Sequence, residues 1–208
     1  RGCEKPELAS ADAWRAYQKR MTDSLRDLLG EEAVLTRQAT AVTGEACTEG
    51  QVVVQRVAYP SEAKLAVPTV LLAPADRSGK LPVTVVLAGD GKEALLAQTG
   101  PQSPRELAQQ GSFVVLPDVR TYGELFSTGG QDAAGQRQAW ERNGIVWGRP
   151  VPGMAATDLR AVLDGVAARP DVDASRVTVV VRGSGDLSLA ALFSMALDVR
   201  IRGADLDF

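Results

Sequence analysis

Apolar side chains recur at steps of three and four positions in the N-terminal part of the chain. They lie between Ser10 and Gly30, at Trp14, Tyr17, Met21, Leu25 and Leu28. This spacing predicts an amphipathic α-helix, with Ser10 as its N-cap and Gly30 at its C-terminal end, where a left-handed residue is favoured. We interpret the apolar stripe as a structural surface that packs on the rest of the protein.

From Gln51 onwards the pattern changes to short runs of β-branched and apolar residues. Such runs predict buried strands, at residues 52–54, 69–72, 83–87, 113–116, 177–181 and 201–206. Helical patterns at residues 103–110, 155–168 and 187–197 separate the later strands. This alternation predicts an α/β fold, a mostly parallel sheet with helices on both faces. Residues 120–152 show no period and are expected to form a long loop, which is either part of a binding or active-site surface or disordered.

Composition narrows the classes of function. The 208 residues include 23 Lys and Arg and 26 Asp and Glu, a formal net charge of −3, with the two signs interspersed. Nucleic-acid binders and membrane-surface proteins carry clustered basic residues, so neither nucleic acid nor a membrane is expected as a partner. No apolar run reaches the roughly 18–20 residues needed to span a bilayer.

The chain contains no histidine and two cysteines, Cys3 and Cys47. These residues alone therefore cannot complete a Ser-His-Asp or Cys-His mechanism, or a His-ligated zinc site. Two cysteines exclude a disulfide scaffold and a four-thiolate metal site, and we expect no metal and no cofactor. Cys3 and Cys47 either form one bridge, as in an oxidising compartment, or are free thiols. The chain begins with Arg1 and not with Met, which indicates a processed or trimmed N-terminus; removal of a signal peptide would make it a secreted or periplasmic protein.

Three polar, glycine-containing segments follow predicted strands, at residues 88–92, 118–124 and 182–186. Ligands of parallel sheets gather at the carboxyl ends of the strands, so we expect these segments to converge there. In the last segment (R-G-S-G-D), Ser184 stands between a strand and a helix, the context of a nucleophile elbow. The usual elbow reads G-x-S-x-G, whereas here the glycines flank the serine directly. The alternative is a glycine-rich turn with an incidental serine.

The other two segments hold the remaining polar candidates. The loop of Gly89 could present backbone N–H groups to an oxyanion. Alternatively it is a plain turn in which Asp90 and Lys92 are solvated charges. A Ser-Lys pair with Lys92 as the base is known chemistry, but no spacing argues for it. We expect an ion pair that fixes the loop among Asp118, Arg120 and Glu124.

Short motifs follow one another in a recognisable order through the whole chain. They are L-P-V at 81–83 with G-D-G-K at 89–92, P-D-V-R at 117–120 with Y-G-E at 122–124, W-G-R-P at 147–150 with G-M at 153–154, D-L-R-A at 158–161, and R-P-D-V-D at 169–173 with S-R-V at 175–177. In this order they resemble bacterial α/β-hydrolases of the acetyl xylan esterase and cephalosporin-C deacetylase kind. The resemblance implies a serine esterase acting on acylated carbohydrate, with Ser184 as nucleophile and the backbone of Gly89 and Gly185 as oxyanion donors.

The chain departs from this family pattern at the elbow and in its C-terminal part. Counting forward from Arg176 places the family's nucleophile near Gly183, and counting back from Asp198 places it near Gly185. The family keeps its acid and its histidine after later strands. We therefore expect a sheet truncated after its sixth strand, with the Asp and the His supplied from outside residues 1–208. The open edge of the last strand is then expected to be covered by further chain or by another subunit.

Two functional hypotheses follow from the sequence. Both assume an N-terminal helical extension at residues 1–48 and an incomplete α/β-hydrolase-like domain at residues 49–208. In the first hypothesis the protein is a carboxylic ester hydrolase that transfers an acyl group from a carbohydrate or small-molecule ester, through an elbow serine, to water. In the second it is a catalytically degenerate hydrolase domain that binds a carbohydrate or a partner protein.

Overall fold

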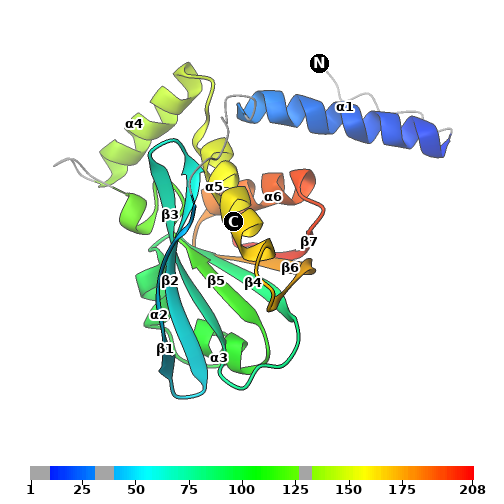
Figure 1. Ribbon diagram of the computed structural model, residues 1–208. Helices are drawn as coiled ribbons and strands as arrows, with labels where there is room; N and C mark the ends of the chain where they lie inside the picture. Colours follow the sequence, from blue (N-terminus) through cyan, green and yellow to red (C-terminus); the bar gives the residue numbers. More distant parts are fainter. Residues whose placement is uncertain (1–9, 31–39, 127–132) are drawn as a thin grey trace.

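The computed structural model describes residues 10–30, 40–126 and 133–208, which form one seven-stranded sheet with helices on both faces (Figure 1). The strands are β1 (Val42–Glu49), β2 (Val52–Glu62), β3 (Leu65–Pro74), β4 (Leu81–Ala88), β5 (Phe113–Pro117), β6 (Val172–Arg182) and β7 (Ile201–Asp205). The helices are α1 (Ala11–Leu29), α2 (Lys92–Leu96), α3 (Pro104–Gln109), α4 (Ala133–Val146), α5 (Val151–Ala167) and α6 (Gly185–Leu197), with a 3-10 turn, η2 (Gly123–Leu125).

The sheet is mixed, with strand order β1-β2-β3-β5-β4-β6-β7. The pairs β4–β5, β4–β6 and β6–β7 are parallel, and the pairs β1–β2, β2–β3 and β3–β5 are antiparallel. The α/β class predicted from the alternation of strands and helices is confirmed. Its antiparallel part is formed by β1, β2 and β3, in which consecutive strands joined by short turns pair antiparallel and β3 continues antiparallel to β5.

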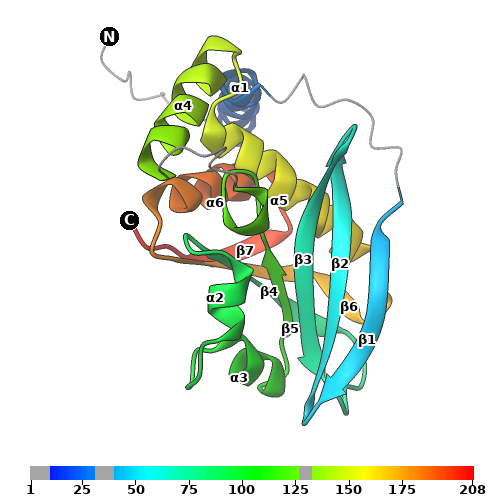
Figure 2. The same cartoon turned by 90° about the vertical axis from the view of Figure 1, so that its left-hand side faces the viewer.

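Each face of the sheet has its own core. Alternate residues of the central strands point to opposite faces, so Val85 and Val115 belong to one cluster and Val86 and Val114 to the other. The first cluster includes buried residues of α5 and α6, and the second includes residues of α2 and α3. Figure 2 shows α2 and α3 on one side of the central strands and α5 and α6 on the other. This double covering explains why these strands are apolar at nearly every position.

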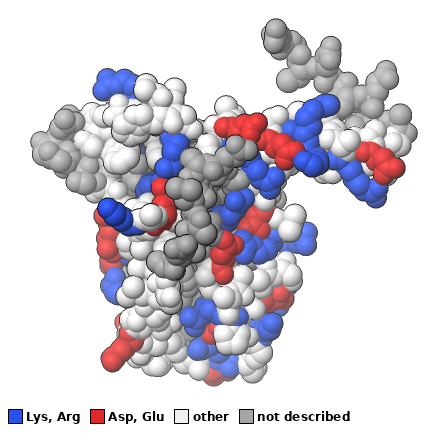
Figure 3. All heavy atoms as spheres, turned by 45° about the horizontal axis from the view of Figure 1, so that its top comes forward, with Lys and Arg blue, Asp and Glu red and all other residues white. Residues whose placement is uncertain are grey.

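The N-terminal helix α1 has the caps that the sequence predicts. The Ser10 hydroxyl accepts from the Ala13 N–H at 3.1 Å, and Gly30 has φ 69° in the left-handed region. The packing expected of the apolar stripe is not present, because three of its residues are exposed, namely Trp14, Met21 and Leu28. Figure 3 shows Lys, Arg, Asp and Glu side chains intermixed on this face of the molecule, α1 included.

Two segments differ from the sequence-based expectation. Residues 42–48, assigned above to a helical extension, belong to strand β1, which pairs with β2 from Val42↔Ala58 to Glu49↔Val52. All eight residues of β1 are exposed, so no alternation of apolar residues marks the strand. Residues 120–152, expected to be a loop, contain α4 and the start of α5. Helix α4 has no clear apolar stripe, which removes the signal that periodicity needs.

The sheet ends at β7, which pairs with β6 and, in the described part of the chain, with no other strand. An unpaired strand edge presents free N–H and C=O groups. The covering of this edge by further chain or by another subunit remains a prediction. No helix within the described ranges is long and apolar enough to cross a membrane.

Candidate functional site

The three glycine-containing segments converge at the carboxyl ends of β4, β5 and β6. A Cβ atom built on Gly89 would lie 3.0 Å from the carbonyl oxygen of Gly183 and 3.5 Å from the Ser184 Cβ, so the two backbones are in contact there. From the third segment, the Tyr122 hydroxyl lies 3.2 Å from the Ser184 Oγ. The structure therefore brings together the predicted site residues Gly89, Ser184 and Gly185.

Gly183 occupies the tip of the turn between β6 and α6. It is the single residue between the end of the strand, Arg182, and the N-cap of the helix, Ser184, and its φ is +64°. A Cβ built on Gly183 meets no heavy atom within 4 Å apart from its chain neighbours. A nucleophile elbow holds its reactive side chain on a strained turn, exposed above the sheet. Here that position belongs to a residue without a side chain.

Ser184 adopts extended backbone angles, φ −155° and ψ 109°, and acts as the N-cap of α6. Its Oγ accepts from the Leu187 N–H at 3.4 Å and is half-buried. Side-chain oxygens at this position satisfy one of the free N–H groups of the first helical turn. The contact gives Ser184 a structural role; its role as a nucleophile remains a prediction.

Replacing Ser184 by alanine is expected to lower the free energy of unfolding by about 0.5–2 kcal/mol, because the first turn of α6 loses its cap. Replacing it by asparagine, which also caps helices, should retain most of that stability. Urea unfolding followed by circular dichroism measures both variants. Equal losses in the two variants would contradict the capping role.

The two predicted oxyanion donors, Gly89 and Gly185, differ in how well their N–H groups are placed to bind an oxyanion. The Gly89 N–H already donates to the Arg182 carbonyl at 3.2 Å. Gly185 begins α6, where N–H groups point out of the helix end. Beside it, the Gly183 N–H donates to the Asp207 carboxylate at 2.9 Å, so one negative charge already lies against the elbow. Of the two predicted donors, Gly185 is thus the better placed.

Lys92 lies in a buried ion cluster and is not the solvated charge expected from its loop. Its side chain is 2% exposed, and its ammonium donates to Asp118 Oδ2 at 2.7 Å and also to the Glu124 carboxylate. Asp118, 1% exposed, further accepts from the backbone N–H groups of Lys92 and Glu124 at 2.8 and 2.9 Å. Asp90 is exposed, as expected. An amine donating to two carboxylates has no free lone pair, so Lys92 is not available as a base for Ser184.

Gly123 allows the loop after β5 to close around this cluster. A Cβ on Gly123 would lie 2.1 Å from the Asp118 Cγ, a separation that atoms cannot adopt, and the φ of Gly123 is +51°. Gly91 is equally close, with its Cβ position 2.6 Å from the Gly123 Cα. The ion pair expected among Asp118, Arg120 and Glu124 is therefore wrong in its cation: both carboxylates pair with Lys92, whereas Arg120 pairs with Asp158 and Glu62.

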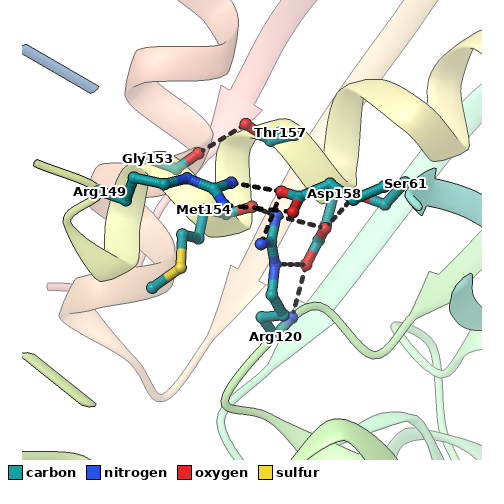
Figure 4. Close-up of polar contacts among 8 residues, drawn as sticks. Ser61, Arg120, Arg149, Gly153, Met154, Thr157 and Asp158 are labelled. Carbon is teal, nitrogen blue, oxygen red and sulfur yellow. Dashed lines mark hydrogen bonds and ion pairs between the residues drawn. The ribbon is translucent and has the colours of Figure 1, made fainter. Parts of the chain in front are cut away.

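Arg120 belongs to a second buried network that joins the loop after β5 to α5 and β2 (Figure 4). Its backbone N–H, Nε and Nη2 donate to the Asp158 carboxylate at 2.8, 2.9 and 2.9 Å. Its Nη1 lies 2.7 Å from Glu62, which also pairs with Arg149, and Ser61 donates to Asp158. The two networks clamp both ends of the segment that presents Tyr122.

Glu62 makes the stability of this network depend on pH. Burial opposes ionisation of its carboxyl, but hydrogen bonds and charge from Arg149 and Arg120 outweigh burial and lower its pKa. Since the folded pKa is below the unfolded one, the unfolded state binds more protons as acid is added. We expect stability to fall as pH decreases through the ordinary glutamate range near 4.5 and below. Urea unfolding of Glu62→Gln should show a weaker dependence on pH; an unchanged dependence would contradict this assignment.

Tyr122 and Arg137 add groups that the sequence analysis did not identify. Burial raises the pKa of Tyr122, so its phenol stays protonated at neutral pH and is no base. The Arg137 guanidinium lies 4.6 Å from the centre of the Tyr122 ring. Arg137 was missed because its helix falls in a segment without apolar periodicity.

Cys47 is an exposed free thiol. Cys3 lies outside the described residues, so the predicted pairing of the two cysteines is not tested. Among the described residues, no three His, Cys, Asp or Glu side chains lie together as a metal site would require.

Comparison with known proteins was made at the level of family, sequence and structure. No family model and no curated protein sequence matches this chain. Solved structures do match, among them a putative acetyl xylan esterase from Bacteroides fragilis, with a TM-score of 0.80 at 14% identity, over 96% of this chain and 56% of that one. An acetyl xylan esterase from Paenibacillus sp. R4 gives 0.62 at 23% identity, over 96% and 60%. A glucuronoyl esterase from Solibacter usitatus gives 0.63 at 17%, over 95% and 59%.

These similarities lie below 25% identity and therefore concern the fold. The chain spans between 56% and 60% of the length of these three structures. The resemblance inferred from the order of sequence motifs is confirmed at this level. The chain has the α/β-hydrolase fold of solved carbohydrate esterases.

Proposed function

We propose that this chain is a catalytically silent form of the carbohydrate-esterase fold, which binds an acylated carbohydrate at the strand ends without hydrolysing it. One observation carries the proposal: the strained tip of the elbow is Gly183, which has no side chain, whereas Ser184 is used as a helix cap. A further observation supports it, since Lys92 is held by two carboxylates.

The carbohydrate ligand class is supported by the fold neighbours, which are named as acetyl xylan and glucuronoyl esterases. The open space above Gly183 leaves room for a ligand at the carboxyl ends of the strands, where ligands of parallel sheets gather.

A second candidate function is an active esterase with Ser184 as the nucleophile and with its base and acid supplied from outside residues 1–208. The observation in its favour is the Tyr122 hydroxyl, 3.2 Å from the Ser184 Oγ at the end of β6. Gly185 N–H would then serve as an oxyanion donor. In this case the ester would be cleaved by acyl transfer to Ser184 and then to water.

Hydrolysis of p-nitrophenyl acetate and of acetylated xylo-oligosaccharides separates the two functions when it is measured on the full-length protein, so that any base and acid outside residues 1–208 are present. For the silent domain, the wild-type chain and Ser184→Asn should release product at the same rate as buffer. Ser184→Asn is a better control than Ser184→Ala, because asparagine retains the N-cap of α6. A rate that is present in the wild type and lost in Ser184→Asn would reject the silent domain in favour of the esterase.

Titration calorimetry with an acetylated xylo-oligosaccharide tests binding at the elbow. Gly183→Asn places a side chain above the strand ends, and asparagine tolerates positive φ better than other non-glycine residues. The Gly183→Asn variant should therefore abolish binding of the oligosaccharide. Gly50→Asn is a matched control, because Gly50 has φ +63° and an equally open Cβ position in the distant β1–β2 turn. Absence of binding by the wild type, or equal binding by both variants, would contradict the proposal.

A further inference from the structure

Arg137 of α4 reaches the strand-end site by lying over two aromatic rings. Its guanidinium carbon is 4.6 Å from the centre of the Tyr122 ring and 5.4 Å from that of Phe126. The Tyr122 hydroxyl is in turn 3.2 Å from the Ser184 Oγ. A chain of direct contacts therefore connects the positive charge of Arg137 to the elbow.

The charge of Arg137 differs from the other arginine charges around this site. Arg120 and Arg149 pair with Glu62 or Asp158, and Arg182 lies 3.5 Å from Asp205. Within the described ranges no carboxylate pairs with Arg137, which lies over the two rings and also interacts with the Tyr122 hydroxyl. A guanidinium carries five N–H donors in a fork geometry that matches a carboxylate, so the donors that do not engage Tyr122 can bind a ligand carboxylate.

The platform beneath Arg137 is rigid. Tyr122 is 3% exposed and is preceded by Thr121, a β-branched residue with φ +69°. The Thr121 hydroxyl is buried and has no hydrogen-bond partner in the described part of the chain. A left-handed conformation at such a residue costs about 1–2 kcal/mol. Strain of this kind persists where the position of a neighbouring group matters for function. Here that neighbour is Tyr122, which supports Arg137.

Negative groups are also present and limit where an anion can bind. The Asp207 carboxylate occupies the Gly183 N–H, and Asp186 is close enough to Tyr122 to influence its ionisation. A ligand carboxylate would therefore be repelled from the first turn of α6 and attracted to the side of the site that Arg137 occupies.

We propose that Arg137 is a specificity-determining residue that anchors a carboxylate, so that the strand-end site prefers acidic carbohydrate, such as an oligosaccharide with a uronic acid group, over neutral carbohydrate. This inference rests on the proposed carbohydrate-binding function. It specifies the charge of the ligand and the residue that recognises this charge.

Titration calorimetry with two xylo-oligosaccharides of equal length tests the inference, one substituted with glucuronic acid and one unsubstituted. The acidic ligand should bind the wild-type chain on the order of tenfold more tightly. Arg137→Met should weaken binding of the acidic ligand on the order of tenfold and so remove this preference. Arg142→Met, at an exposed position of the same helix, should retain the preference. Added salt should weaken the binding of the acidic ligand more than that of the neutral ligand.

The outcomes separate the two proposals. If the wild type binds both ligands equally, or if Arg137→Met keeps the preference for the acidic one, the role of Arg137 is rejected while carbohydrate binding stands. If neither ligand binds, the carbohydrate-binding function itself is rejected, and the role of Arg137 with it.

Discussion

Replacing Asp158 by asparagine is expected to destabilise the protein by about 3–5 kcal/mol, because it removes one partner of a buried ion pair. Asp158 is 0% exposed and accepts three hydrogen bonds from Arg120. The amide of asparagine has the same shape, but it replaces one acceptor oxygen by a donor that faces the N–H groups of Arg120. The remaining carboxylate, Glu62, is shared with Arg149 and only partly compensates the charge.

Asp164→Asn on the same helix is the control for this variant. Asp164 lies 2.7 Å from Arg200, but its side chain is half-exposed, so its loss should cost only about 0–1 kcal/mol. Urea unfolding of both variants gives the comparison. Similar losses at the two positions would contradict the view that the Arg120 network is a buried clamp.

Replacing Lys92 by methionine is expected to have an effect of similar size, about 3–5 kcal/mol. Methionine fills the volume but leaves the Asp118 carboxylate buried with no cation. Asp118 keeps its two backbone donors, which stabilise the charge only in part. The double variant Lys92→Met/Asp118→Asn should recover some of the lost stability, because the uncompensated charge of Asp118 is removed.

Arg56→Met is the matched control for Lys92→Met. Arg56 pairs at 3.0 Å with Glu93, the residue after Lys92, and both side chains of that pair are exposed. This change should cost less than about 1 kcal/mol. Thermal and urea unfolding measure all three variants. A stable Lys92→Met protein would show that the cluster does not hold the loops of the site.

The parts of the fold that follow from local side-chain patterns could be predicted. The caps of α1 and the buried central strands are examples, since a cap or a run of β-branched residues acts within a few positions. Strand β1 could not be predicted, because all its residues are exposed and its pairing with β2 is made by the backbone. The burial of Lys92 was missed for another reason: its partner Asp118 is 26 residues away and only the folded sheet brings them together.

The location of the site could be predicted from the sequence, but its geometry could not. The convergence of the segments around Gly89 and Ser184 follows from the parallel order of β4 and β6. The residue at the tip of the elbow was ambiguous, because counting along the chain from different motifs gave Gly183 or Gly185. Backbone angles resolve the ambiguity: the left-handed residue between strand and helix is Gly183, and the serine next to it is a cap.

The central claim is that the elbow of this chain holds no activated nucleophile. Incubation with a fluorophosphonate, which reacts covalently with activated serines, followed by intact-protein mass spectrometry tests it most directly. An acetyl xylan esterase serves as the positive control under the same conditions. The account predicts an unmodified mass for the wild-type chain while the control is fully labelled. A phosphonate adduct mapped to Ser184, and absent in Ser184→Asn, would contradict it.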